Sequence, residues 1–451
     1  MTGEGPVADN RIDIARAIDD APIGGLQIRV FLLCAFVAML DGFDTQSIAF
    51  VTPVIAEDWG VDGKSFGPIF SAGLAGLMLG QLIFSMLSDR FGRRRVIILS
   101  TLCFGALTLA TAAAQNWWML LGLRFLAGFG LGGAIPNIMA ITAEFAPRRI
   151  RATMVALVFG GFPLGAVLGG YLSMHLIAAF GWHAVFIAGG IAPLALVPVL
   201  IATLPESPRF LLRAGAGHET ALARVMQAIV PAAAQPGCTF FADEPAAARA
   251  SLASLFSDRR AGPTTMLWIA FFMSLLVIYF LMSWLPLIIK DRGLSLDTGI
   301  AAAMALNLGG ALGGVVLGWL IDRHSPYPVL IGAFLSGALS IVAIGLSGGA
   351  MTPLIASVFV AGFFSVGTQT GLSAFTTGQY PTALRSTGIG AALAVGRIGS
   401  IVGPMAGGAL LAAGHPIDRI FFAVAVPPLC AALVLVAHGA FSRRAAAPAA
   451  I

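Results

Sequence analysis

Apolar runs of about 20 residues, separated by short polar or charged turns, dominate the chain. A run of that length is long enough to cross the hydrocarbon core of a bilayer as an α-helix. Six runs precede a long polar stretch and six follow it. The predicted spans are 29–55, 66–87, 96–114, 117–143, 154–178 and 182–204, then 264–289, 300–321, 329–346, 353–377, 387–413 and 420–438. The pattern predicts an all-α membrane protein with twelve transmembrane helices in two six-helix bundles.

The composition supports this prediction. Hydrophobic residues make up 58% of the 451 residues and charged residues only 10%, whereas a soluble domain carries about 25% charged residues. Lipid gives helices no hydrophobic reason to associate, so close backbone contact has to hold them together. The 55 glycines suit such contacts. A water-soluble fold is excluded on these grounds.

The polar stretches divide the chain into five parts. The linker between the bundles contains an amphipathic stretch, Glu219–Ile229, but no pairing of a nucleophile with a base. The N-terminal segment lacks the apolar core of a removable signal peptide. We expect an N-terminal segment (1–28), a first bundle (29–204), a linker (205–263), a second bundle (264–438) and a tail (439–451).

Basic residues gather in the loops on one side of the predicted membrane. Cytoplasmic loops carry an excess of Lys and Arg, so that side is predicted to be cytoplasmic, together with both termini. The same rule accounts for the net charge of +5 without a nucleic-acid partner. The residues concerned are Arg90, Arg93, Arg94, Arg95, Arg148, Arg149, Arg151, Arg323, Arg385, Arg443 and Arg444.

Two landmarks repeat along the chain with nearly the same offset. Asp89-Arg90 recurs as Asp322-Arg323, 233 positions later, and Arg151 recurs as Arg385, 234 positions later. Parallel repeats of this kind place a substrate site between the halves, near the middle of the bilayer. The repeat predicts transport by alternating access rather than a receptor or a scaffold.

The loop between the second and third spans reads Leu-Ser-Asp-Arg-Phe-Gly-Arg-Arg, at 87–94, and resembles the loop signature of the major facilitator superfamily. The sequence Pro-Glu-Ser-Pro-Arg at 205–209 resembles the ending that is common after the sixth span of that family. The resemblance implies a cytoplasmic gate between the halves, with Glu144 as a possible partner. The gating residues would be Asp89, Arg90 and Arg93, with Asp322, Arg323 and Arg385 in the second half.

Two carboxylates, Asp41 and Asp44, lie well inside the first span. Their spacing of three puts them on one face of a helix. An ionisable group at that depth is costly and is a functional candidate by default, the alternative being structural pairing with an arginine. We therefore predict that the pair takes part in proton coupling, with Arg124 and Glu144. Which of the two aspartates carries the proton stays open.

Two arginines lie at a comparable depth. Arg124 belongs to a stretch that resembles the RxxxGxG motif of proton-coupled members, and Arg397 lies in the middle of the eleventh span. A guanidinium stays charged and can hold a carboxylate through two hydrogen bonds. We predict that Arg124 pairs with Asp44 and that Arg397 binds the anionic substrate. In the alternative, Arg397 caps a backbone defect near its neighbouring glycines.

The Asp-Gly-Phe-Asp sequence of the first span, with LRFLAGFGLGGAIPN in the fourth and YPTALRSTGIG and GRIGSIVGP around the eleventh, resembles the aromatic acid/proton symporter family. The resemblance implies that the protein takes up a benzoate-like acid together with protons across a bacterial inner membrane. It also implies a part in aromatic hydrocarbon catabolism. Aromatic side chains offer flat walls to a ring, and amides bond ring hydroxyls. Besides Asp44 and Arg124, the candidates are Phe43, Tyr279 and Trp284, and Asn137, Asn307 and Gln369.

Other functions fit the sequence less well. A symporter of another organic anion, such as a sugar acid or a dicarboxylate, stays open, and a drug/proton antiporter suits the fixed arginines poorly. The sequence contains no zinc-ligand helix, no GxSxG and no Walker loop, so we expect neither an enzyme nor an ATP-driven pump. We expect no cofactor, no metal site and a monomer.

Overall fold

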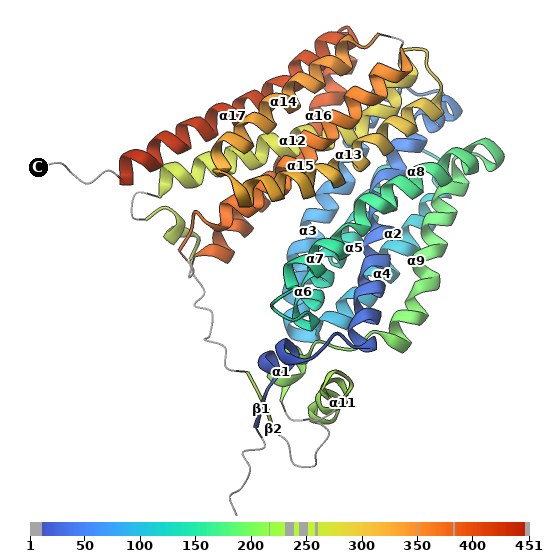
Figure 1. The fold of residues 1–451 in the computed structure, drawn as a ribbon. Helices are drawn as coiled ribbons and strands as arrows, with labels where there is room; N and C mark the ends of the chain where they lie inside the picture. Colours follow the sequence, from blue (N-terminus) through green and yellow to red (C-terminus); the bar gives the residue numbers. More distant parts are fainter. Residues whose placement is uncertain are drawn as a thin grey trace, which may run out of the picture.

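A computed structural model describes residues 11–215, 217–230, 239–242, 251–257, 260–348, 350–381 and 384–446. Twelve helical segments in the described chain are long and apolar enough to cross a membrane. They form two bundles of six, which Figure 1 shows in blue to green and in yellow to red. The predicted all-α membrane fold is confirmed.

The first bundle is built from eight helices, because two of its spans are interrupted. The fourth span breaks at Gly133, between α5 and α6, and the fifth breaks at Gly160, between α7 and α8. The helices are α2 (Gly25–Trp59), α3 (Gly67–Phe91), α4 (Arg93–Thr111), α5 (Trp117–Gly132), α6 (Ala134–Phe145), α7 (Arg151–Phe159), α8 (Gly161–Phe180) and α9 (His183–Thr203), with the short η1 (Gly63–Phe66) before α3.

The second bundle consists of six continuous helices. Its helices are α12 (Ala261–Asp291), α13 (Leu296–Arg323), α14 (Pro326–Leu346), α15 (Met351–Thr377), α16 (Arg385–Ala412) and α17 (Ile417–Ala446). Tight packing between α13 and α15 and between α12 and α16 holds it together. Glycines on α13 and α16 allow these close approaches.

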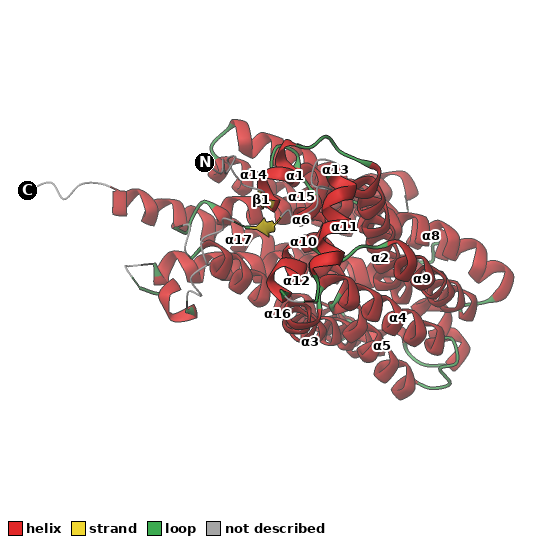
Figure 2. Ribbon diagram, turned by 90° about the horizontal axis from the view of Figure 1, so that it is seen from below, coloured by secondary structure: helices red, strands yellow, loops and turns green. Residues whose placement is uncertain are grey.

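The N-terminal segment and the linker fold together into a small cap. In it the strand β1 (Arg11–Asp13) pairs in parallel with β2 (Thr239–Phe241). The remaining cap elements are α1 (Ile14–Asp20), α10 (Pro208–Ala214) and α11 (Glu219–Ile229), whereas η3 (Leu252–Leu255) packs against α16 of the second bundle. Figure 1 places α1, β1, β2 and α11 at one end of the first bundle, and Figure 2 looks onto that end, which we call the cap end.

The cap is held by one apolar face and one set of charges. Ile14 and Ile18 are buried in a cluster that also contains Leu222 and Met226 of α11. Asp19 pairs with Arg148 at 3.2 Å and accepts the Arg148 backbone N–H at 2.7 Å. The basic loop before α7 is therefore partly neutralised by the chain's own N-terminal segment.

The two bundles meet at the opposite end, which we call the closed end. There α2 packs on α12, α3 on α16 and α8 on α13. Lys290 forms an ion pair with Glu57 at 2.5 Å across the halves, and the Ser71 hydroxyl donates to the Ile401 carbonyl at 2.7 Å. Toward the cap end the bundles diverge (Figure 1).

Candidate functional site

A charged group lies buried inside the first bundle, where α2, α4 and α5 meet. The Asp44 carboxylate accepts a hydrogen bond from the Thr108 hydroxyl at 2.5 Å and pairs with Arg124 at 3.5 Å. Arg124 also donates to Thr111 at 3.2 Å, and its guanidinium lies 5.0 Å from the centre of the Phe186 ring. Both charged side chains are almost fully enclosed. The predicted pairing of Arg124 with Asp44 is present in the structure.

Gly42 explains how α2 aims Asp44 at this group. A Cβ atom at Gly42 would collide with the Phe162 carbonyl of α8, so the backbones of α2 and α8 touch there. Asp44 lies two residues further on, about 200° around the helix. It therefore points away from α8 and toward the arginine of α5.

Asp41 is buried as deeply as Asp44 but has fewer partners. One of its oxygens accepts the Thr45 hydroxyl at 3.2 Å, while Oδ2 is buried without a hydrogen-bond partner among the described residues. Asp41 lies within electrostatic reach of Asp44 and of Arg397 in the other bundle. A buried polar atom without a partner is rare and calls for an explanation. A bound proton or ligand would supply the missing bond.

Arg397 approaches the first bundle's acids from α16. Gly399 and Gly403 lie against the carbonyls of Phe272 and Leu276, which brings α16 onto α12. Arg397 then donates to the Tyr279 hydroxyl of α12 at 2.9 Å. Its side-chain hydrogen bond goes to a phenol, not to the backbone defect of the alternative hypothesis.

The predicted ring walls serve helix packing in this conformation. Trp284 is fully buried, donates to the Pro404 carbonyl at 3.0 Å and meets Phe70 edge to face. Phe43 is buried against Gly169 and Gly189 of the first bundle. A substrate contact at either residue stays a prediction.

The three predicted amide side chains differ in their hydrogen-bond partners. The side chains of Asn137 and Asn307 donate to carbonyls of their own helices, Gly133 at 2.8 Å and Ala303 at 2.9 Å. Gln369 Oε1, in contrast, is buried without a hydrogen-bond partner in the described chain. Of the three, Gln369 is the amide whose oxygen is buried without a partner in the described chain.

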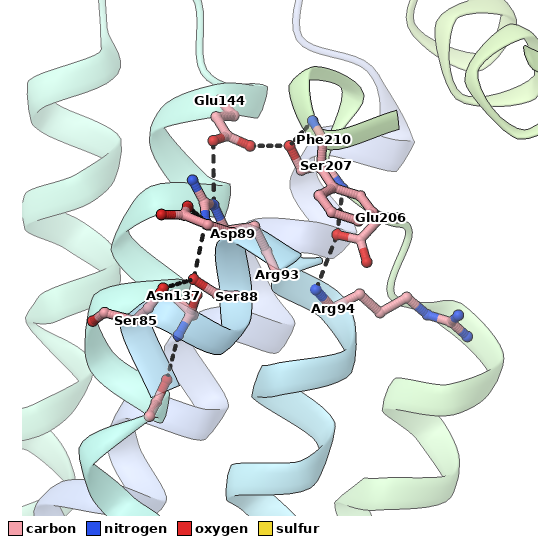
Figure 3. A network of polar contacts seen from close by, with 11 residues as sticks. Ser85, Ser88, Asp89, Arg93, Arg94, Asn137, Glu144, Glu206, Ser207 and Phe210 are labelled. Atoms are coloured by element: carbon pink, nitrogen blue, oxygen red, sulfur yellow. Dashed lines mark hydrogen bonds and ion pairs between the residues drawn. The ribbon is translucent and has the colours of Figure 1, made fainter. Parts of the chain in front are cut away.

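A second polar network lies toward the cap end, between α3, α4, α6 and the segment after α9 (Figure 3). Arg93 donates to Ser88 at 3.0 Å and pairs with Asp89 at 3.1 Å and Glu144 at 3.4 Å. The Ser207 hydroxyl donates to Glu144. Glu144 thus lies with the loop residues. Among the described residues it makes no hydrogen bond to the buried aspartates, so its role in proton coupling stays a prediction.

Glu206 holds the start of α4 from the same segment. Its carboxylate accepts the backbone N–H groups of Arg94 at 3.0 Å and Ser207 at 2.9 Å. Burial raises the pKa of Glu206, and these donors oppose the effect. Gly92 leaves space for Glu206, since a Cβ atom there would collide with the carboxylate. The Pro-Glu-Ser-Pro-Arg sequence and the loop signature are therefore in contact.

A model of the Major Facilitator Superfamily matches residues 34–348 and 302–449. This chain belongs to the major facilitator superfamily. It is 39% identical over 437 residues to a gallate transporter of Pseudomonas putida, with 96% of each chain covered. It is 36% identical over 433 residues to the 4-hydroxybenzoate transporter PcaK of the same species, again with 96% of each chain covered.

Solved structures support the fold of this major facilitator protein. A bacterial homologue of the human lysosomal transporter Spinster, crystallised in an inward-facing and occupied conformation, superposes with a TM-score of 0.68. Its sequence is 16% identical, and the match covers 94% of this chain and 97% of that chain. The chain is an integral membrane protein of a transporter family.

The remaining gating candidates of this major facilitator protein lie exposed at the cap end. Asp322 and Arg385 are exposed, and the Arg323 guanidinium lies 4.5 Å from the centre of the Trp319 ring. Arg90 lies over the neighbouring Phe91 ring. Across the described residues, the loop-signature ion pairs stay within the first bundle. A latch between the bundles at this end stays a prediction.

Sequence reasoning missed the neutral partners of these charges. Thr108 and Thr111 of α4 complete the buried group around Asp44, and Ser207 with Glu206 completes the loop network. Hydroxyls in apolar helices commonly bond their own backbone, so a threonine in a span carries little signal. A carboxylate beside the loop signature was visible in the Pro-Glu-Ser-Pro-Arg sequence. We find no cluster of metal-ligating side chains in the described part of the chain.

Proposed function

We propose that this transporter takes up a small aromatic carboxylate, such as benzoate or a hydroxybenzoate, together with protons. The observation that carries the proposal is the buried set of Asp41, Asp44 and Arg124 in one bundle facing Arg397 in the other. Charges at this depth are expensive unless they handle cargo or ions. The gallate and 4-hydroxybenzoate transporters among its relatives support an aromatic acid as the cargo.

We assign the proton to Asp41 because its carboxylate has fewer hydrogen-bond partners than that of Asp44. Asp44 has a guanidinium partner at one oxygen and a hydroxyl donor at the other, so both of its oxygens are occupied. Asp41 has one weak donor and an oxygen without a partner in the described chain. In our proposal Asp41 binds and releases the proton, while Asp44 holds Arg124 in place.

The substrate carboxylate is assigned to Arg397. Over the described residues the ion pairs leave Arg397 without a carboxylate of its own, so its charge is available to an anion. Gln369 offers a buried acceptor to a ring hydroxyl. Phe43, Trp284, Asn137 and Asn307 stay weaker candidates, because packing or helix carbonyls already occupy them.

We propose that the two halves provide alternating access. The contacts at the closed end and the divergence of the bundles toward the cap end support an inward-facing state, with the cap end in the cytoplasm of a bacterial cell. A proton and an anion that enter together between the halves would leave on that side. The halves would then rock back about the central charges.

The test is uptake by proteoliposomes under an imposed pH gradient, at a pH where the acids are ionised. A panel of radiolabelled benzoate, hydroxybenzoates and gallate is offered to the wild type, with protein-free liposomes as the control for passive entry. We expect gradient-driven accumulation that a protonophore removes and that Asp44→Asn and Arg397→Ala abolish.

Two outcomes would contradict the proposal. Accumulation of none of the aromatic acids, with a sugar acid or dicarboxylate accumulated instead, would replace the substrate class. Accumulation that persists in Asp44→Asn would remove Asp44 and its pairing with Arg124 from the coupling mechanism.

A further inference from the structure

The Tyr279 hydroxyl is the side-chain partner of Arg397, and the contact joins two helices of the same bundle. Arg397 donates to this oxygen at 2.9 Å. Arginine has five N–H donors in a fixed plane, so one contact fixes the orientation of the group and leaves other donors unused. The geometry raises the question of what the phenol does for the arginine.

The phenol is itself held in a fixed place. The Tyr279 ring packs against the apolar cluster of the closed end. Gly399 and Gly403 press the backbone of α16 onto α12 close to this contact. A long arginine side chain otherwise loses rotamer freedom when it binds a ligand, which opposes binding. A guanidinium that is already oriented avoids part of this cost.

Charge balance indicates a ligand rather than a structural bond. The ion pairs of the described residues give Arg124 and Arg292 carboxylate partners but none to Arg397. Tyr279 is a neutral partner, and it orients the guanidinium without cancelling its charge. An acidic residue in its place would compete with an anionic substrate for the same donors.

We propose that Tyr279 is a positioning residue, which orients Arg397 so that its free donors receive the carboxylate of the substrate. This assignment rests on the proposed function, and it replaces the ring-wall role that the sequence suggested for Tyr279. The two roles make different demands. A wall needs the ring and not the hydroxyl, whereas a positioning residue needs the hydroxyl.

Tyr279→Phe separates the two roles, because it keeps the ring and removes the oxygen. We expect the KM for uptake of a benzoate-type acid to rise about tenfold, the factor that matches one lost hydrogen bond to a charged group. The maximal rate under the pH gradient should stay near that of the wild type. Tyr171→Phe, the same chemical change on the exposed face of α8, is the matched control and should leave the KM unchanged.

Two further variants make the result specific to Arg397. Arg397→Gln should weaken the competition by benzoate in a binding assay. Adding Tyr279→Phe to this variant should weaken the competition little further, because the guanidinium that Tyr279 orients is gone. Tyr279→Gln supplies a carbonyl acceptor without a ring, and it should bind benzoate more tightly than Tyr279→Leu.

The outcomes are distinguishable from failure of the proposed function. Wild-type protein that transports no aromatic acid would contradict the function itself. Wild-type uptake with an unchanged KM in Tyr279→Phe would overturn the positioning role and restore the ring wall. Independent, additive losses from Tyr279→Phe and Arg397→Gln would overturn it as well.

Discussion

The buried acid of α2 is held by side chains from two other helices rather than by a single ion pair. Thr108 and Arg124 reach the Asp44 carboxylate from α4 and α5, and Thr111 steadies the guanidinium. An ion pair without further hydrogen bonds rarely offsets the cost of burying its charges. The threonines therefore make the pair tolerable inside the bundle.

We expect Thr108→Val to lower the stability of the protein by about 1–3 kcal/mol, the cost of leaving a buried group without its hydrogen bond. Valine matches threonine in shape, so packing is kept. Thermal unfolding in detergent measures the effect. Thr101→Val on the same helix is the control, because the Thr101 hydroxyl bonds only the Ile97 carbonyl of its own helix. Equal shifts for both variants would show that Thr108 has no special role.

The charged members of this group were visible in the sequence, but their neutral partners were not. Asp41, Asp44, Arg124 and Arg397 stand out because ionisable residues are rare inside apolar spans. Which arginine faces which acid depends on the packing of helices far apart in the sequence. The sequence suggested the Arg124–Asp44 pair, whereas the contact of Arg397 with Tyr279 needed the close approach of α12 and α16.

At the scale of helices, backbone contact at glycine replaces the hydrophobic effect. Gly42 lies against the Phe162 carbonyl, and this contact sets the rotation of α2 on which the direction of Asp44 depends. A glycine between two buried aspartates therefore has a mechanical role. It lets α2 and α8 approach more closely than any side chain would allow.

Gly42→Ala should destabilise the protein and lower the uptake rate, since a Cβ atom there meets a backbone carbonyl that cannot move aside. Gly122→Ala on α5 is the matched control, because nothing lies near its Cβ position. Alanine in an open helical position stabilises by up to about 1 kcal/mol. The melting temperature should therefore fall in Gly42→Ala and rise in Gly122→Ala. A fall of the same size in both variants would contradict the role of close packing at Gly42.

Glu206 gives the loop network a pH dependence. Burial raises its pKa in the folded protein above the ordinary 4.5. The protonated form therefore favours folding, and that contribution is complete below pH 4.5 and is lost as the pH rises through the folded-state pKa. Glu206→Gln should melt higher than the wild type at neutral pH and equally at the acid end. The exposed Glu219→Gln is the control. A difference in melting temperature between Glu206→Gln and the wild type that does not narrow as the pH falls would contradict this pH dependence.

The sequence predicted the helices better than their interruptions. Long apolar runs decide which segments span, and the described helices fall where those runs are. The breaks at Gly133 and Gly160 were missed, because the apolar pattern continues through them. The pairing of β1 with β2 was missed as well, since three-residue strands from distant segments leave no periodic signal.

The whole molecule consists of two helical bundles joined mainly at the closed end. On the first half, Asp58 accepts the indole N–H of Trp182 at 3.1 Å and fixes the end of α2. On the second half, Arg292 donates to the Ile344 and Gly345 carbonyls and fixes the end of α12. Lys290 and Glu57 connect these two anchored ends, so their ion pair must break if the closed end opens.

Glu57→Gln and Lys290→Gln should each favour the state that is open at this end. Glu57 is largely exposed, so the pair is worth about 0.2–1 kcal/mol and the shift should be about 1.4- to fivefold. The rate at which an impermeant maleimide labels Leu287→Cys, a position buried at this seam, measures the shift. Asp297→Asn, a nearby exposed change of charge, is the control. An unchanged labelling rate in these variants would contradict the proposal that this ion pair keeps the closed end shut. Effects of Glu57→Gln and Lys290→Gln on the labelling rate that add in the double variant would contradict it as well.

In the proposed mechanism a buried acid carries a proton together with the substrate. The most direct measurement records internal pH with a trapped dye while a benzoate-type acid is added outside proteoliposomes, in wild type and in Asp41→Asn. Wild type should acidify the interior on addition of substrate. Asp41→Asn should exchange labelled for unlabelled substrate without any proton entry. Substrate-dependent acidification by Asp41→Asn at the wild-type rate would contradict the account.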